Sequence, residues 1–240
     1  MPPLHIDVLD DASDSTPSSA GFIRVRRLTM RATYEDGTRS EAFRYDVVDR
    51  DALDAVLMLL HAPRADAPTD PLVVLRTAMR PPLAMRAHRS LTVPDARTEP
   101  LLWELPAGLI EANERGEDGM LATAARETEE ETGYVIAPER FARLGAAVYL
   151  SPGLCAEKIH VVHATVDPAA RSAVTSTEAV EHGSRIEWVP LSDAIARADR
   201  GEIEDCKTEL ALRRFAAQLA APAAAPVVPA ADQGTPGGAA

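Results

Sequence analysis

The chain is predicted to fold as an α/β protein in which a mixed sheet lies between helices. Two observations predict this class. Short apolar segments bounded by Gly, Pro and Asp recur along the chain, as strands do. Three other segments, over 120–132, 192–200 and 207–219, repeat their apolar residues at helical spacing. Strands that alternate with helices are typical of layered α/β folds. We therefore expect an α/β sandwich with helices on both sides of the sheet.

The first structured element is expected to be a β-hairpin over 21–48. Apolar and polar residues alternate over 27–34 and again over 43–47, as in half-buried strands. Asp36-Gly37 between them is a favoured two-residue hairpin turn. A hairpin of this size is not stable alone, so it must pack on the main domain or on a second subunit.

The main domain is expected to span 49–220, within a chain of 240 residues. A long polar loop over 81–100 carries several arginines, and loops of this length are often functional. The segments 1–20, rich in Asp, Ser and Pro, and 221–240, rich in Ala, Pro and Gly, are expected to be disordered. The predicted strands of the main domain are 55–60, 72–75, 101–105, 144–150, 159–166 and 186–189.

Charge and composition exclude several classes of protein. A net charge of −12 argues against nucleic acid or an anionic membrane as the main partner. Cys155 and Cys206 form neither a disulfide framework nor a CxxC metal site, which fits a reducing compartment. The chain shows no signal peptide and no apolar run near the roughly 20 residues that span a bilayer. We expect a soluble, cytoplasmic protein.

The segment 120–132 contains the residues that indicate a chemical function. Its apolar face is expected to pack on the core, whereas Glu127, Glu130 and Glu131 follow each other at i, i+3 and i+4 and should converge on another face. Carboxylate oxygens are the ligands that Mg²⁺ and Mn²⁺ prefer, and such ions neutralise phosphate. Arg126 can tether one of the glutamates, and Gly133 is placed to end the helix in a left-handed conformation. The alternative is a solvated acidic helix or a metal-buffering protein.

Together with a Leu-Pro-Ala-Gly turn ending at Gly108, this segment resembles the motif of the Nudix hydrolases. Gly108 matches the first glycine, and Arg126 to Gly133 match the second half of the motif. Eleven residues separate Glu114 from Arg126 where the family has seven, so the first acidic position could belong to Glu114, Glu117 or Asp118. Thr128 stands at a position that is usually aliphatic. The resemblance implies the Nudix-type α/β/α sandwich with a mixed sheet.

Three further segments are similar to the ADP-ribose and nucleotide-sugar pyrophosphatase branch of that family. They are Trp-Glu-Leu-Pro-Ala-Gly over 103–108, an Arg-Pro-Pro segment at Arg80, and a Ser-Pro-Gly loop that leads to Glu157. Ala78 stands where that branch has a glutamine. The resemblance implies Ala107 (through its carbonyl), Glu127, Glu130 and Glu131 as metal ligands, Arg126, Glu130, Glu131 and Glu157 as catalytic residues, Arg80 and Glu104 as substrate contacts, and Gly108 and Gly133 as structural residues.

The function that this resemblance implies is hydrolysis, with Mg²⁺ or Mn²⁺, of a nucleoside diphosphate linked to a sugar. ADP-ribose, giving AMP and ribose 5-phosphate, is the leading substrate. The branch also uses an N-terminal sheet in a dimer, so we expect a homodimer built through the hairpin. The alternatives are a UDP- or GDP-sugar pyrophosphatase and a non-catalytic Nudix-like nucleotide sensor.

Overall fold

The structure is a computed structural model that describes residues 17, 21–86, 88–95, 97, 99–174 and 183–221. The expectation of disorder over 1–20 and 221–240 therefore falls outside the described residues, apart from residues 17 and 221. Within the part that is described, no helix is long and apolar enough to cross a membrane.

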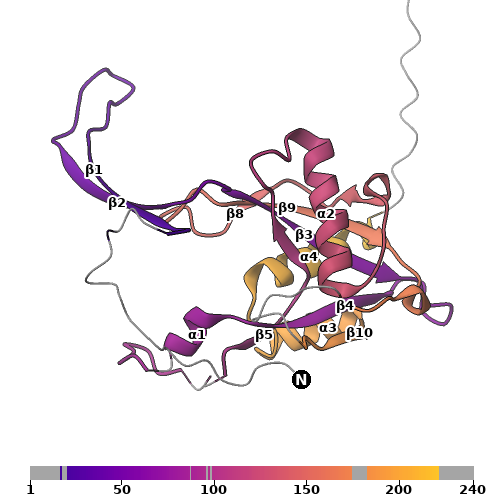
Figure 1. The fold of residues 1–240 in the computed structure, drawn as a ribbon. Coiled ribbons are helices and arrows are strands. Elements are labelled where there is room, and N and C mark those ends of the chain that lie inside the picture. Colours follow the sequence, from indigo (N-terminus) through magenta and orange to yellow (C-terminus); the bar gives the residue numbers. More distant parts are fainter. Residues whose placement is uncertain are drawn as a thin grey trace, which may run out of the picture.

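A mixed sheet forms the centre of the main domain (Figure 1). Its principal order is β10-β4-β3-β9-β7, with β5 on β4, β6 on β3 and β8 on β9. The pair β3–β9 is parallel and the other pairs are antiparallel, which confirms the predicted mixed sheet. The strands are β3 (Asp54–Ala62), β4 (Leu72–Met79), β5 (Leu101–Glu104), β6 (Ala107–Leu109), β7 (Ala142–Arg143), β8 (Val148–Tyr149), β9 (Lys158–Thr165) and β10 (Ile186–Pro190).

Helices cover both faces of this sheet. Successive side chains of a strand point to opposite faces, and the odd and even residues of β3 accordingly belong to two different cores. Val56, Met58 and Leu60 pack with Met120 and Ala124 of α2 (Gly116–Thr132). The intervening residues of β3 pack with α3 (Leu191–Asp199) and α4 (Cys206–Ala220). This arrangement is the expected α/β/α sandwich.

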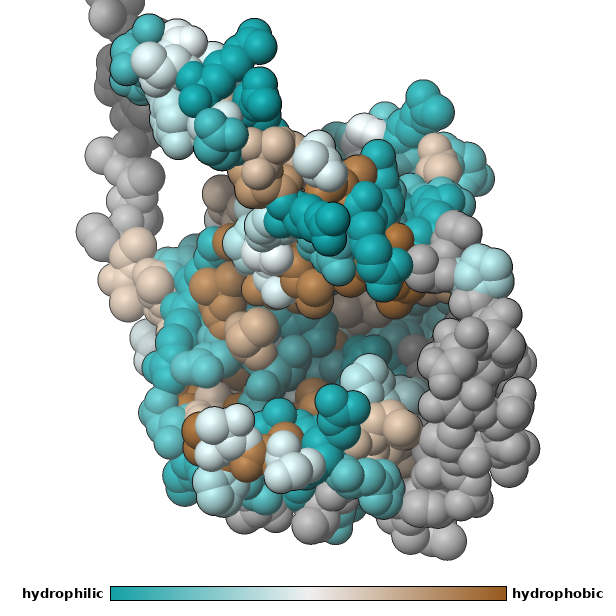
Figure 2. Space-filling view, turned by 90° about the vertical axis from the view of Figure 1, so that its left-hand side faces the viewer, coloured by the Kyte–Doolittle hydropathy of each residue, from teal (hydrophilic) through white to brown (hydrophobic). Residues whose placement is uncertain are grey.

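The N-terminal hairpin forms a separate two-stranded antiparallel sheet of β1 (Arg24–Met30) and β2 (Phe43–Asp49). It extends away from the main domain (Figure 1). The expectation that its apolar residues are half-buried is wrong for several of them within one protomer, because Met30, Tyr34, Phe43 and Tyr45 are exposed. Seen from the side of the hairpin, brown apolar residues lie at the surface among teal hydrophilic ones (Figure 2).

Several local predictions need correction. The expected strand over 144–150 is replaced by two short strands, β7 and β8, with Gly145 at a φ of 79° between them. The hairpin turn has three residues, 35–37, rather than two, because the Tyr34 N–H donates to the Thr38 carbonyl. The loop over 81–100 contains a short helix, α1 (Pro81–Arg86), which begins at the two prolines; proline is well tolerated in the first turn of a helix. The acidic helix α2 begins at Gly116, four residues before the expected start at Met120. Its end is as predicted: Gly133 has φ 77° and its N–H donates to the carbonyl of Glu129. Two 3₁₀ turns, Pro138–Arg140 and Pro168–Ala170, complete the elements.

Candidate active site

The turn between β5 and β6 lies directly against α2. A Cβ atom at Gly108 would lie 2.1 Å from both Cγ and Cδ of Glu127, far inside van der Waals contact. Only a glycine lets the Glu127 side chain lie this close to the backbone of β6. The two halves of the motif, which are separated in sequence, therefore meet at Gly108 and Glu127.

Arg126 gathers three carboxylates, a grouping that we call the Arg126 cluster. Its Nη1 atom lies 2.8 Å from Glu127 Oε1 and 3.3 Å from Glu130 Oε2, and its Nη2 lies 3.4 Å from Glu114 Oε1. Burial alone would lower the pKa of Arg126, but the charges of Glu127, Glu114 and Glu130 outweigh it and raise that pKa. Arg126 stays charged and holds three glutamates together, whereas the sequence predicted that it would tether one.

Of the three candidates for the first acidic position, the structure brings Glu114 to Arg126. Glu114 Oε2 accepts hydrogen bonds of 2.8 Å from the Glu111 N–H and from the Thr123 hydroxyl. Burial would raise its pKa, but these hydrogen bonds and the charge of Arg126 together hold the pKa below its ordinary value. Gly119 makes this packing possible, since a Cβ there would lie 2.3 Å from the carbonyl carbon of Glu114. Glu117 instead pairs with Arg143.

Glu131 lies apart from this cluster, in the core. Glu131 as a whole is 2% exposed. It forms an ion pair with Arg76 of β4, and its Oε2 accepts a hydrogen bond of 3.0 Å from the Ala107 N–H. The expected convergence of Glu127, Glu130 and Glu131 is therefore not found, and no group of three His, Cys, Asp or Glu side chains poised to hold a metal occurs among the described residues. The reason is that Arg76, a charge buried in β4, pairs with Glu131 in the core.

The two predicted substrate contacts pair with each other. Arg80 Nε donates to Glu104 Oε2 at 3.2 Å, and Lys207 Nζ lies 3.2 Å from the same oxygen. Glu104 is fully buried, so its carboxylate is held by these two cations, whereas 42% of the Arg80 side chain is exposed. Burial acts to lower the pKa of Arg80, but the charge of Glu104 raises it overall. Sequence reasoning missed Lys207, which stands at the start of α4 and carries no motif.

Glu157 lies in the loop that receives the hairpin. It forms an ion pair with Arg50, which follows β2. The Tyr45 hydroxyl donates to the Gly153 carbonyl at 2.9 Å, and the Val48 N–H donates to the Leu154 carbonyl at 2.9 Å. The structure thus connects Glu157 to the hairpin. The sequence did not indicate this contact, because Arg50 and Glu157 are 107 residues apart.

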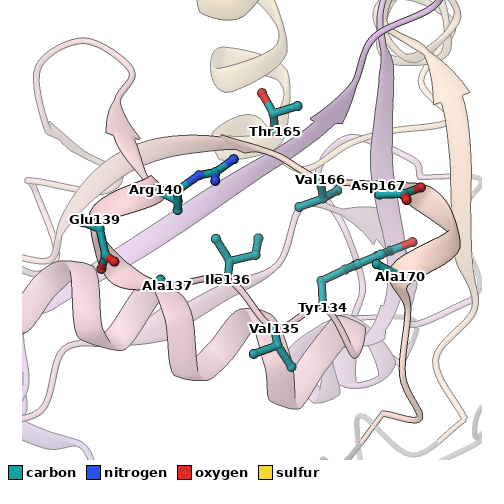
Figure 3. A pocket seen from close by; sticks show the side chains of 10 residues that line it. All are labelled: Tyr134, Val135, Ile136, Ala137, Glu139, Arg140, Thr165, Val166, Asp167 and Ala170. Atoms are coloured by element: carbon teal, nitrogen blue, oxygen red, sulfur yellow. The ribbon is translucent and has the colours of Figure 1, made fainter.

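A cavity of about 390 Å³ lies beside α2, where the segment that follows the helix runs back along it (Figure 3). Apolar and charged side chains are mixed around it, and it contains none of the predicted site residues. We assign it no role in the chemistry of the motif. Its lining residues are Tyr134, Val135, Ile136, Ala137, Glu139, Arg140, Thr165, Val166, Asp167 and Ala170.

The Arg126 cluster has the composition of a site for a hard divalent cation. Its donors are carboxylate oxygens, which Mg²⁺ and Mn²⁺ prefer, and three carboxylates already surround one positive group within 3.4 Å. The close approach of Glu127 to β6 also brings the backbone of Gly108, the residue after Ala107, to the same place. Glu114, Glu127, Glu130 and the carbonyl of Ala107 therefore fit a divalent ion chemically.

Comparison with known proteins identifies the family of the chain. The sequence model of the NUDIX domain matches residues 72–208, which is more than half of the chain and includes α2, Gly108 and Arg80. None of the curated proteins compared matches the chain. Nudix hydrolases act on phosphorus anhydrides and generally use divalent metal ions such as Mg²⁺ or Mn²⁺. By its sequence match and its fold, the chain belongs to the Nudix family.

Proposed function

We propose that this protein hydrolyses a nucleoside diphosphate linked to a sugar, with ADP-ribose, giving AMP and ribose 5-phosphate, as the leading substrate. The observation that supports it best is the Arg126 cluster, in which Glu114, Glu127 and Glu130 stand around one guanidinium beside the Gly108 turn. A group of carboxylates can bind an anionic diphosphate only when a cation lies between them. Nudix hydrolases generally use divalent metal ions.

The carboxylates of the cluster and the Ala107 carbonyl would hold Mg²⁺ or Mn²⁺. When bound, such an ion neutralises the diphosphate, polarises the phosphorus centre and lowers the pKa of water. Arg126 orients Glu127 and Glu130 through its Nη1 atom. Because Glu130 keeps 45% of its side chain exposed, its carboxylate can exchange Arg126 for a ligand without crossing the core.

Arg80 and Glu157 complete the proposed site. The guanidinium of Arg80 is fixed on one side by Glu104 and is exposed on the other, so it can contact a phosphate or ribose oxygen. Glu104 acts by positioning Arg80 rather than by reaching the substrate itself. Glu157 is proposed as the general base, and its ion pair with Arg50 would set its orientation.

We propose a homodimer in which the hairpin of one protomer contacts the other. The exposed aromatic and aliphatic side chains on β1, β2, their turn and the two residues before β1 support it, because a two-stranded sheet needs further packing to be stable. The two thiols, Cys155 and Cys206, are free, which favours a cytoplasmic location. The residues concerned in the interface are Phe22, Ile23, Met30, Tyr34, Phe43 and Tyr45.

Two alternatives have specific support. Ala78, which stands at the position of the branch's glutamine, is 3% exposed and offers no polar contact, so a UDP- or GDP-sugar could replace ADP-ribose as the substrate. The engagement of Glu131 by Arg76 favours a non-catalytic nucleotide sensor, because it withdraws one carboxylate of the motif.

The test is turnover by the purified full chain with Mg²⁺ or Mn²⁺, measured by coupled phosphate release. Substrates are ADP-ribose, UDP-glucose, GDP-mannose, NADH and a nucleoside triphosphate, and Glu127→Gln is the control for a contaminating enzyme. We expect ADP-ribose to be preferred. Turnover of another nucleotide sugar would change the substrate and keep the reaction, whereas no turnover of any with either ion would favour the sensor.

A further inference from the structure

Arg76 is a charged residue in the core of the sheet. It lies in β4, where every residue after the first is buried, and it is 1% exposed. Removing a guanidinium from water costs several kcal/mol unless anionic or polar groups surround it. The strand therefore needs a carboxylate close to this position.

Helix α2 supplies that carboxylate through Glu131. Arg76 Nη1 pairs with Glu131 Oε1, and Arg76 Nη2 donates to Ser184 Oγ at 3.2 Å. The other carboxylate oxygen, Oε2, accepts the hydrogen bond from the Ala107 N–H at 3.0 Å. Both oxygens of Glu131 thus have a donor, one on the neighbouring strand and one on the β6 turn.

This pairing conflicts with a second cation at the same carboxylate. A divalent ion bound to Glu131 would stand within a few ångströms of the Arg76 guanidinium, and like charges repel strongly where water is excluded. The side chain of Glu131 is 3% exposed, so solvent would screen this repulsion little. The Arg126 cluster differs, because its carboxylates are 16–45% exposed.

We propose that Arg76 takes the place of a divalent ion at Glu131, so that metal is held by Glu127, Glu130 and Glu114 while Glu131 is a positioning residue. In this role Glu131 fixes the Ala107 N–H, and with it the turn at the residue whose carbonyl is a metal ligand in the proposed function. The inference rests on that proposed function and assigns within it which carboxylates of α2 bind metal.

Mn²⁺ binding tests the assignment without any substrate. The number and affinity of bound Mn²⁺ ions are measured by titration calorimetry and electron paramagnetic resonance on the full chain. We expect Glu127→Gln to weaken Mn²⁺ binding at least roughly 10-fold, which corresponds to loss of one good ligand. We expect Glu131→Gln, and the double variant Arg76→Met with Glu131→Gln, to keep the number of ions and to change the affinity less than about twofold.

The variant Arg76→Met provides the converse test. It leaves Glu131 buried without its guanidinium, so Mn²⁺ should raise its melting temperature clearly more than it raises that of the wild type. The double variant lacks both charges and should return to the wild-type response. If Arg76→Met does not fold, the double variant and Glu131→Gln still decide the question.

The possible outcomes distinguish the role of Arg76 from the metal assignment of the proposed function. Loss of Mn²⁺ from Glu131→Gln to the same extent as from Glu127→Gln would overturn the role of Arg76 and leave the proposed function intact. Unchanged Mn²⁺ binding in both Glu127→Gln and Glu130→Gln would overturn the metal assignment of the proposed function itself.

Discussion

Helix α2 contributes to two groupings of arginine with glutamate that differ strongly in burial. At one, the side chains of Arg76 and Glu131 are 1% and 3% exposed. At the other, Arg126 is 38% exposed and its partners Glu114, Glu127 and Glu130 are 19%, 16% and 45% exposed. The first grouping pairs one guanidinium with one carboxylate and the second pairs one guanidinium with three, but only the second is open to solvent.

Burial decides what each grouping can do. A buried ion pair cannot lose one partner without leaving a charge out of water, so it behaves as a fixed part of the fold. A half-exposed pair is worth little energy, because water replaces either partner readily. Its carboxylates can therefore exchange an arginine for a ligand, which a functional site requires.

The largest expected difference between the two groupings is in the stability lost when each arginine is replaced. We expect Arg76→Met to lower the free energy of unfolding by about 3–5 kcal/mol, because it leaves Glu131 as an unpaired buried charge. We expect the matched change Arg126→Met to lower it by about 1 kcal/mol or less, since the Arg126 cluster is solvated. Urea denaturation in the presence of a chelator measures both values. Equal losses would show that burial does not separate the two groupings.

The next effect is on activity. We expect Glu130→Gln to lower turnover roughly 10²- to 10³-fold, the loss typical of removing one charge-stabilising group, with little change in stability because Glu130 is half-exposed. The control is Glu129→Gln, one residue earlier on the exposed side of α2. Steady-state turnover with Mg²⁺, together with denaturation curves, gives both quantities. Near-wild-type turnover of Glu130→Gln would remove Glu130 from the site.

A smaller effect is expected at the turn that faces the cluster. In Gly108→Ala the new methyl group would displace the Glu127 side chain, at a cost of about 1–3 kcal/mol. Because a side chain can move more easily than backbone, most of this cost should appear as weaker Mn²⁺ binding and slower turnover. Gly153→Ala is the control, since a Cβ there meets nothing within 4 Å. Equal behaviour of the two variants would contradict the contact.

The smallest effect comes from a partly buried histidine, His61. His61 is paired with His163 Nδ1 at 3.2 Å and packs on Phe215. Burial, and then the charge of His163, lower the pKa of His61 to about 4. The unfolded chain takes up this proton at an ordinary pKa of 6.5, so stability is lost as the pH falls from 6.5 towards 4.

After allowance for solvent exposure, that loss should be about 1–2 kcal/mol. Denaturation at a series of pH values measures it, and His61→Asn should flatten the curve over this window. His163, whose burial also lowers its pKa, contributes in the same direction. A wild-type curve that stays flat from pH 6.5 to 4 would exclude the assignment.

Much of the fold follows from local patterns. The strands 55–60 and 72–75, the helix end at Gly133 and the two C-terminal helices were predicted from periodicity and helix-end residues, and β3, β4, α2, α3 and α4 confirm them. These patterns predict strands and helices because each element must bury its own apolar face. The exposure of the hairpin could not be read in this way, since alternation marks an apolar face without showing what covers it.

The site was predicted less completely. The sequence identified the carboxylates of α2 and the Gly108 turn, but it left the first acidic position open among Glu114, Glu117 and Asp118. The structure brings Glu114 to Arg126 because Gly119 lets the inserted loop fold back on the helix. Lys207 and Arg50 were missed, because each acts through a partner distant in sequence.

By itself, the sequence determined the class of protein, the acidic helix and the type of ligand that its oxygens can hold, because these depend on residue type and spacing. Only the tertiary structure decided which carboxylate faces solvent and which faces the core. Glu127, Glu130 and Glu131 lie within five residues, yet Arg76, on a strand 55 positions away from Glu131, separates the last from the others. Burial and charge pairing are set by the neighbours that folding supplies, and those neighbours are not contained in the spacing of a motif.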